Sequence, residues 1–270
     1  MTTNQKFKNI FKKNGSLVCL GLDPEMEKLP KSVLKKKNPI FNFNKEIIDA
    51  THKVVASYKP NIAFYEAYGL VGLKELKLTL LYLKQKCPEV PVILDAKRGD
   101  IGNTAKMYAR SVFEWWDVDA VTVYPHLGFD AVLPFLEYRD RLTILLIKTS
   151  NPDSKQFQDL PVKSEPFFYA MAKKISTWRG ENIGIFVGAT YPKELARIRK
   201  LFPKSMMLTA GVGAQKASLG AAVRAGVDKI GENIVFNASR SILYASSGTD
   251  FAEAAFKEAK KLRELINQFR

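Results

Sequence analysis

Residues 92–101 read VILDAKRGDI, and this stretch joins the fold of the chain to its chemistry. It opens with an apolar, β-branched-rich run that is typical of a buried parallel strand. Four charged residues follow within six positions. Asp95 and Lys97 stand two apart, so a strand directs both side chains to the same face. Gly99 ends the strand pattern and Asp100 lies beyond the turn, so we expect a carboxylate and an ammonium together at a strand exit.

The same order of an apolar run and then an amphipathic helical stretch recurs along the 270 residues. The expected strands are 17–22, 58–64, 92–94, 120–123, 142–147, 183–187, 206–209 and 229–230. The expected helices are 40–56, 70–86, 104–116, 129–138, 167–178, 192–202, 216–225 and 238–245, and an extra C-terminal helix covers 251–269. Eight alternations without a long linker predict an α/β fold, a parallel (β/α)₈ TIM barrel forming a single domain over residues 1–270.

A doubly wound open sheet is the alternative architecture. It would need a Gly-rich dinucleotide turn after the first strand, and residues 20–24 read LGLDP rather than G-x-G-x-x-G, so the barrel ranks well above it. The one extended connection, residues 150–165, is a candidate lid. Thr190 is a candidate cap for the helix that begins at Pro192.

Composition limits the functional classes. The formal net charge is +15, but the lysines are spread along the chain, which favours a solvated surface over a nucleic-acid site. Two cysteines are too few for a disulfide framework or a thiolate metal site, and two histidines argue against a His-rich metal centre. Residues 1–15 lack the apolar core of a signal peptide, and no run is long enough to span a membrane. We expect a cytoplasmic protein with no membrane partner.

Polar residues follow the expected strands at the end where barrel enzymes carry their chemistry. They are Asp23 after the first strand, Lys59 in the second, Asp95 and Lys97 in the third, Ser150 after the fifth, the AGVGAQ turn at 210–215 after the seventh, and Arg240 after the eighth. The strand assignment predicts that these residues meet at one mouth of the barrel.

The last two groups suggest a phosphate ligand, because barrel phosphate sites are commonly built from the loops after strands seven and eight. Gly211 and Gly213 let backbone N–H groups approach an anion. Gln215 can donate a side-chain hydrogen bond, and Arg240 can donate to two phosphate oxygens. A tight turn and a surface arginine would explain the same residues without a ligand, but their shared position favours a phosphate site.

The charged residues around Asp95 have two interpretations. They can form a structural ion pair at the barrel end, although a buried pair contributes little stability. Alternatively, Lys59, Asp95, Lys97 and Asp100 form an alternating array whose charges nearly cancel, which suits a site that holds ionised groups away from water.

The segment LDAKRGDIGNT at 94–104 resembles the signature of the orotidine 5′-phosphate decarboxylase family in its longer bacterial form. Further segments follow in the family's order over nearly the whole chain: GLDP at 21–24, YKPN at 58–61, FYE at 64–66, TSNP at 149–152, GVGAQ at 211–215 and SR at 239–240. A D-x-K-x-x-D motif alone is shared with related barrels that act on sugar phosphates, whereas the full set is specific.

The resemblance implies decarboxylation of orotidine 5′-monophosphate (OMP) to uridine 5′-monophosphate (UMP) and CO₂, the last step of UMP biosynthesis, without a metal or an organic cofactor. The implied catalytic residues are Lys97, Asp95, Asp100 and Lys59, and Lys97 would stabilise and protonate the C6 carbanion. The implied substrate-binding residues are Asp23, Ile101, Thr104, Ser150, Gly211, Gly213, Gln215 and Arg240. It also implies a homodimer with shared sites, in which Asp100, Ile101 and Thr104 reach the partner's substrate.

Two other functions and one departure from the family pattern accompany this hypothesis. The nearer function is a metal-dependent sugar-phosphate decarboxylase or aldolase on the same barrel, and the remoter one is a basic nucleic-acid-binding barrel without catalysis. His126 stands where the family more often has other residues around a proline. We expect it to pack or to hydrogen-bond at the barrel mouth rather than to catalyse.

Overall fold

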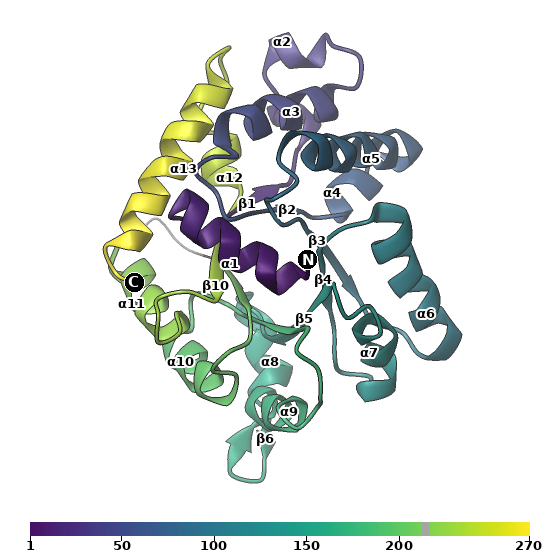
Figure 1. Cartoon of the computed structure of the whole chain (residues 1–270), viewed down its shortest axis with the longest axis vertical. Helices are drawn as coiled ribbons and strands as arrows, with labels where there is room; N and C mark the ends of the chain where they lie inside the picture. The colour runs from purple at the N-terminus through teal and green to yellow at the C-terminus, as the bar shows by residue number, and fades with distance from the viewer. Residues whose placement is uncertain (212–215) are drawn as a thin grey trace.

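A closed parallel sheet forms the centre of the molecule in the computed structural model, which describes residues 1–211 and 216–270 (Figure 1). Its strands pair in the order β2-β1-β10-β9-β8-β5-β4-β3, and bridges of Tyr58 with Val92 and Asn61 with Asp95 join the two ends. The strands are β1 (Val18–Leu22), β2 (Ser57–Pro60), β3 (Ile93–Arg98), β4 (Ala120–Val123), β5 (Leu142–Lys148), β8 (Ile183–Val187), β9 (Met207–Ala210) and β10 (Ile234–Ala238). The predicted (β/α)₈ barrel is confirmed.

Helices surround this sheet (Figure 1). The longer ones are α3 (Pro39–Thr51), α5 (Gly69–Lys86), α6 (Gly102–Arg110), α7 (Phe129–Leu136), α9 (Phe167–Ile175), α10 (Pro192–Leu201), α11 (Lys216–Gly226) and α13 (Phe251–Asn267). Shorter ones are α2 (Lys31–Leu34), α4 (Ala63–Glu66) and α12 (Arg240–Leu243), and a π-helix, η2 (Ser111–Trp116), continues α6. The expected C-terminal helix is confirmed as α13, whose Phe251 stacks on Phe43 of α3 with ring centroids 5.1 Å apart.

The sequences of the strands are nearly continuous apolar runs because other parts of the protein cover both faces of the sheet. Every residue of β1, β2, β4 and β5 is buried, with the helices on one side and the barrel interior on the other. Burial of a Leu, Ile or Val side chain contributes about 1.5–3 kcal/mol. Burial of these side chains therefore stabilises the barrel, and the polar side chains lie at the ends of its strands.

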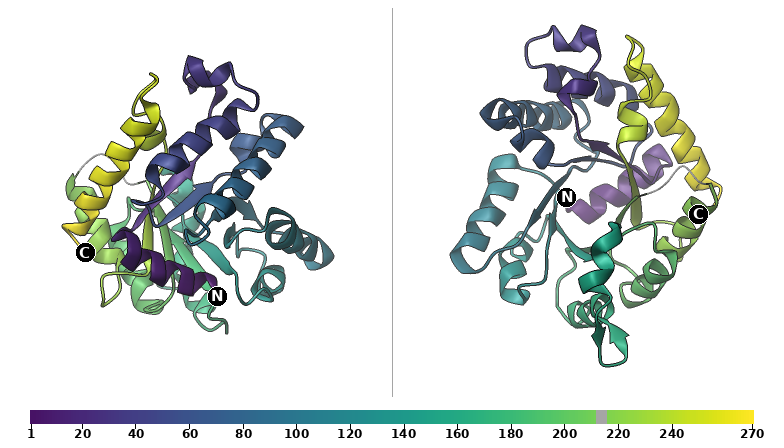
Figure 2. Two further views of the ribbon diagram at one scale, coloured as in Figure 1. Left: turned by 45° about the horizontal axis from the view of Figure 1, so that its top comes forward. Right: turned by 180° about the vertical axis from the view of Figure 1, so that it is seen from behind.

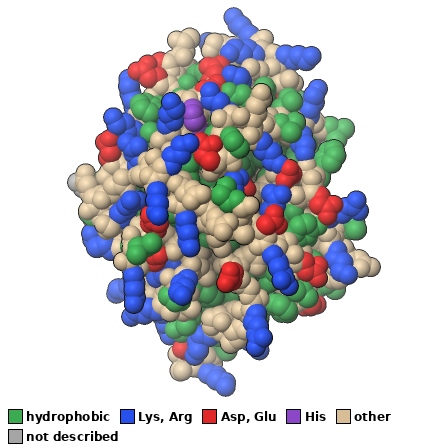
Figure 3. All heavy atoms as spheres, in the orientation of Figure 1, with side chains coloured by type: hydrophobic (Ala, Val, Ile, Leu, Met, Phe, Trp, Pro, Cys, Tyr) green, Lys and Arg blue, Asp and Glu red, His purple; other side chains and the backbone are tan. Residues whose placement is uncertain are grey.

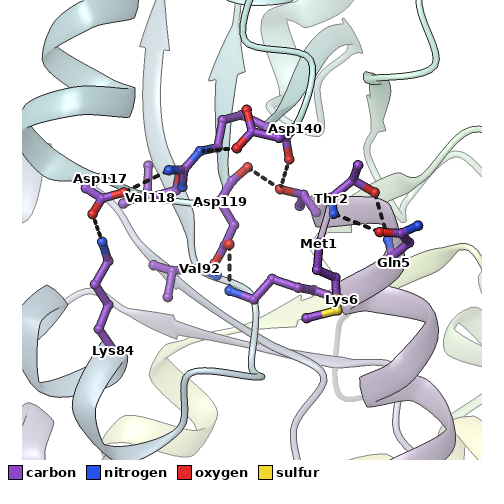
Figure 4. A network of polar contacts seen from close by, with 12 residues as sticks. Met1, Thr2, Gln5, Lys6, Lys84, Val92, Asp117, Val118, Asp119 and Asp140 are labelled. Carbon is purple, nitrogen blue, oxygen red and sulfur yellow. Dashed lines mark hydrogen bonds and ion pairs between the residues drawn. The ribbon is translucent and has the colours of Figure 1, made fainter.

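An additional helix that was not predicted, α1 (Thr3–Asn14), crosses the end of the barrel where the strands begin (Figure 1). Thr2 and Gln5 form a capping box at its start, and Phe7 and Phe11 are buried. Lys6 Nζ lies 2.6 Å from Oδ1 of Asp119, the residue before β4, within the polar network of Figure 4. This helix closes one end of the barrel, so the cavity opens at the other end.

The predicted position of the eighth strand, the predicted end of the second strand and one predicted cap are wrong. The eighth strand is β10 (Ile234–Ala238) instead of residues 229–230, which lie in a turn held by the Asp228 side chain. The second strand ends at Pro60, because the Asn61 side chain accepts the Ala63 N–H at the start of α4. The residue that caps α10 is Tyr191 rather than Thr190, and no side chain bonds there.

Residues 150–165, here called the lid segment, lie on the side of the barrel opposite α1 (Figure 2). The segment contains η3 (Pro152–Ser154), α8 (Lys155–Gln158) and β6 (Pro161–Val162), which pairs with β7 (Glu165–Pro166). No helix in the described ranges is long and apolar enough to cross a membrane. On the face that carries α1, Lys and Arg side chains are spread over many elements, with Asp and Glu among them (Figure 3).

Candidate active site

The carboxyl ends of the barrel strands open into a cavity of about 630 Å³. Five residues predicted for the site line it, namely Asp23, Lys59, Asp95, Lys97 and Ser150. Leu146, Phe186 and Leu208 supply apolar wall, and the lid segment contributes residues from Asn151 to Gln158. The cavity therefore combines an apolar wall with a few convergent polar groups, as ligand sites commonly do.

Asp95 is the centre of the polar network. Its Oδ2 accepts a hydrogen bond from Lys59 Nζ at 2.9 Å, and its Oδ1 accepts one from Lys97 Nζ at 2.8 Å. Thr122 Oγ1 donates to the same Oδ1 at 2.8 Å. Asp95 is 9% exposed and Lys59 is 4% exposed, whereas 40% of the Lys97 side chain is exposed and Lys97 lines the cavity. Lys97 is thus the cation that a ligand can reach.

Attraction between the opposite charges of this network keeps Asp95 and Lys59 ionised. Burial alone would raise the pKa of Asp95, but the charges and hydrogen bonds of Lys59 and Lys97 hold it well below its usual range. Burial opposes the charge of Lys59, yet Asp95 and Asp23 keep the pKa of that ammonium above its usual value. Both groups therefore stay ionised through the neutral range.

Lys97 reaches Asp95 through an irregular backbone. Its φ is 44°, a left-handed conformation that a residue other than glycine rarely adopts, and the pairing of β3 with β4 shifts register between Leu94 and Arg98. The Lys97 N–H donates to Thr122 Oγ1 at 3.0 Å, which holds this turn. Thr122 is not among the residues predicted for the site, and its only signal in the sequence is that it is the one hydroxyl residue in the apolar strand β4.

Asp23 also lines the cavity and directly follows β1, the strand that pairs with β2. Ser239 Oγ donates to its Oδ2 at 2.7 Å, and the Asn61 N–H donates to its Oδ1 at 3.1 Å. A Cβ on Gly21 would lie 1.8 Å from Ser239 Oγ, so glycine is required for this approach. The GLDP segment and the SR segment of the sequence therefore meet at one carboxylate.

The expected phosphate residues lie beside Asp23. Gly211 and Arg240 line a second hollow of about 450 Å³ that shares Asp23 and Asn237 with the main cavity. Gly211 has φ +85°, and a Cβ on it would lie 3.4 Å from Ser150 Oγ. The root of the lid segment therefore touches the turn after β9. Gly213 and Gln215 lie outside the described residues.

Comparisons with known proteins agree with this geometry. The model of the orotidine 5′-phosphate decarboxylase / HUMPS family matches residues 16–255. The chain belongs to this family. It is 45% identical over 266 residues to the orotidine 5′-phosphate decarboxylase of Flavobacterium johnsoniae, covering 98% of this chain and 96% of that protein. Over 271 residues it is 45% identical to that of Cellvibrio japonicus, with 99% and 98% covered.

A solved structure supports the same assignment. The OMP decarboxylase of Leishmania donovani superposes with a TM-score of 0.85 at 34% identity, and the match covers 100% of this chain and 98% of that one. The family resemblance inferred from the motifs is therefore confirmed over nearly the whole chain.

Three residues of the family signature lie away from the cavity of their own chain. Asp100 follows β3, and its carboxylate accepts the N–H of Ile101 at 2.8 Å. Ile101 is 58% exposed, and Thr104 in α6 is exposed as well. None of the three lines the cavity described above. These three residues therefore lie outside the cavity that this chain forms by itself.

His126 makes ring contacts at the edge of the mouth. Its ring centroid lies 5.7 Å from that of Tyr124 and 6.0 Å from that of Phe167, and burial lowers the pKa of His126. These contacts agree with the packing role expected for it. Tyr124 itself lines the cavity, so His126 supports a cavity wall without being part of it.

Proposed function

We propose that the chain decarboxylates OMP to UMP and CO₂, the last step of UMP biosynthesis, with the cavity at the barrel mouth as its active site. The observation that carries the proposal is the arrangement at Asp95, whose two oxygens accept hydrogen bonds from Lys59 and Lys97 at 2.9 and 2.8 Å. A fixed anion and a fixed, accessible cation stand side by side in a partly apolar cavity. Family membership supplies the reaction class.

The reaction breaks the bond between C6 and the carboxylate carbon and leaves the electron pair on C6. Lys97 stabilises that carbanion and then gives C6 a proton, which completes UMP. Preorganised charge of this kind is usually the largest catalytic contribution. Asp95 lies near the substrate carboxylate, and two like charges about 4 Å apart at an effective dielectric near 20 repel by roughly 4 kcal/mol. That repulsion ends when CO₂ leaves.

Contacts far from C6 offset this repulsion. Asp23 binds a ribose hydroxyl, and Ser150 bonds the pyrimidine ring at the root of the lid segment. Gly211 and Arg240 bind the phosphate, and Gly213 and Gln215 are assigned to it by the family motif. Binding energy from such remote groups is available to hold the reacting group in an unfavourable ground state.

The proposed enzyme is a homodimer with shared sites. Six large apolar side chains that lie in α5, α6 and α7 or just before α6 and α7 are exposed: Leu70, Val71, Ile101, Met107, Leu127 and Phe129. Large exposed apolar side chains of this kind suit a surface that a partner covers. A partner on this surface receives Asp100, Ile101 and Thr104 into its own cavity.

The chemistry assigned to this site needs no metal. Both oxygens of Asp95 already accept hydrogen bonds from ammonium groups, so Asp95 has little capacity left to bind a divalent ion of a sugar-phosphate decarboxylase or aldolase. The test is to follow the loss of OMP absorbance with the purified chain before and after a strong chelator. We expect the same rate in both and UMP as product. No loss of OMP, or loss that the chelator stops, would overturn the proposal.

A further inference from the structure

An ion pair between a buried lysine and a partly exposed carboxylate fixes the lid segment at a point outside the cavity. Lys148, the last residue of β5, has 1% of its side chain exposed, and its Nζ lies 2.5 Å from Asp159 Oδ1. The rings of Tyr191 and Phe168 lie 5.0 and 5.3 Å from the same nitrogen. A lysine is almost never fully buried without a partner, so its position depends on Asp159 and on the two aromatic faces.

This ion pair joins the two ends of a loop, and several residues of that loop line the cavity. Lys148 and Asp159 stand at the two ends of residues 148–159, and the lid residues that line the cavity all lie between them. A second pair of contacts lies next to the first. The Thr149 N–H donates to Gln158 Oε1 at 2.9 Å, and Gln158 Nε2 donates to Thr149 Oγ1 at 2.8 Å. The loop is therefore tied at its base by two adjacent residues from each end.

We propose that the Lys148–Asp159 pair is a latch that holds the lid segment over the substrate, which makes Lys148 a positioning residue for the decarboxylation. This inference rests on the proposed function. Lys148 does not touch the cavity and acts through Gln158 and Phe157, which do. Tying the base of a loop removes conformations that substrate binding would otherwise have to exclude, so the latch lowers the entropic cost of binding.

The test uses two variants that remove a charge. Lys148→Met keeps an unbranched side chain without the ammonium, and Asp159→Asn keeps the size of the side chain without the negative charge. The matched control is Lys6→Met, which breaks the 2.6 Å Lys6–Asp119 pair at the opposite end of the barrel. We expect the KM for OMP to rise about tenfold or more in both latch variants, while kcat changes by less than about threefold. The control should keep the wild-type KM.

Two further measurements distinguish a latch from a purely structural pair. The double variant should have no higher KM than the worse single variant, because the two residues act as one unit. Trypsin should cleave after Lys155, an exposed lid residue, faster in the latch variants than in the control, and UMP should slow that cleavage. Should Lys148→Met fail to fold, Asp159→Asn carries the test, since the Asp159 side chain is 36% exposed.

The results separate two failures. In the first, wild-type protein converts OMP, but the KM of both latch variants stays within twofold of the wild-type value and their melting temperatures fall as in Lys6→Met. The ion pair is then only structural, and the latch proposal is wrong. If wild-type protein does not convert OMP, the proposed function fails and the latch fails with it.

Discussion

Lys97 places its ammonium 2.8 Å from Asp95 Oδ1 while its own backbone adopts a left-handed φ of 44°. This conformation is strained for a residue with a Cβ and is easily adopted by glycine. We predict that Lys97→Gly is more stable than Lys97→Ala by about 1 kcal/mol, since both variants lose the ammonium and only glycine relieves the backbone. Denaturant unfolding measures the difference. Equal stabilities would mean that the backbone at this position is unstrained.

Gly21 leaves room for the hydrogen bond from Ser239 to Asp23. A methyl group there meets Ser239 Oγ at 1.8 Å, so Gly21→Ala should lower the free energy of unfolding by about 1–3 kcal/mol and weaken UMP binding. Adding Ser239→Gly removes the colliding atoms, and the double variant should regain stability without regaining UMP affinity. Calorimetry of unfolding and of UMP binding measures both. A stable Gly21→Ala variant with normal affinity would contradict the packing described here.

The shared site has a complementation test. Lys97→Ala and Asp100→Ala homodimers should each be nearly inactive. In a mixed dimer one site contains Lys97 of one chain and Asp100 of the other, and that site is intact. Random mixing of equal amounts should therefore restore about a quarter of wild-type activity per chain, because half of the dimers are mixed and each has one of two sites intact. No recovery after subunit exchange would refute the shared site.

Asp49 gives a pH prediction that is independent of catalysis. Burial opposes its charge, but hydrogen bonds from Tyr82, Lys45 and Lys86 lower the pKa of Asp49 to about 2. The folded pKa is below the unfolded one, so the contribution to stability is present above about pH 4 and is lost as the pH falls through about 2. Asp49→Asn should cost about 1–2 kcal/mol at pH 7, allowing for solvent screening, and little at pH 2. A cost that is constant with pH would contradict this.

The barrel and most of its mouth follow from the sequence because strand burial on both faces gives continuous apolar runs with polar residues at their ends. The eighth strand was misplaced because Asp228 accepts the N–H groups of Ile230 and Glu232, and this side-chain turn has no apolar periodicity. Helix α1 was missed because its cap, Thr2 with Gln5, is a weak signal in a polar, basic stretch.

Long-range partners were also beyond the sequence. Thr122 completes the contacts of Asp95, and Asp159 neutralises Lys148, but neither belongs to a motif with fixed spacing. The positive φ of Lys97 was not predicted either. A regular strand already places Lys97 on the same face as Asp95, so nothing in the sequence pattern called for an irregular backbone. Residues of this kind are set by tertiary packing, which local pattern does not encode.

Turnover by Lys97→Ala, compared with wild-type protein, tests the central claim most directly. The substitution removes the accessible cation and the proton donor together, so kcat should fall by at least about 10⁴-fold. UMP binding by calorimetry and the unfolding transition should stay close to wild type, which shows that the site is still built. Turnover within about tenfold of wild type would contradict the assignment of Lys97 as the group that stabilises and protonates C6.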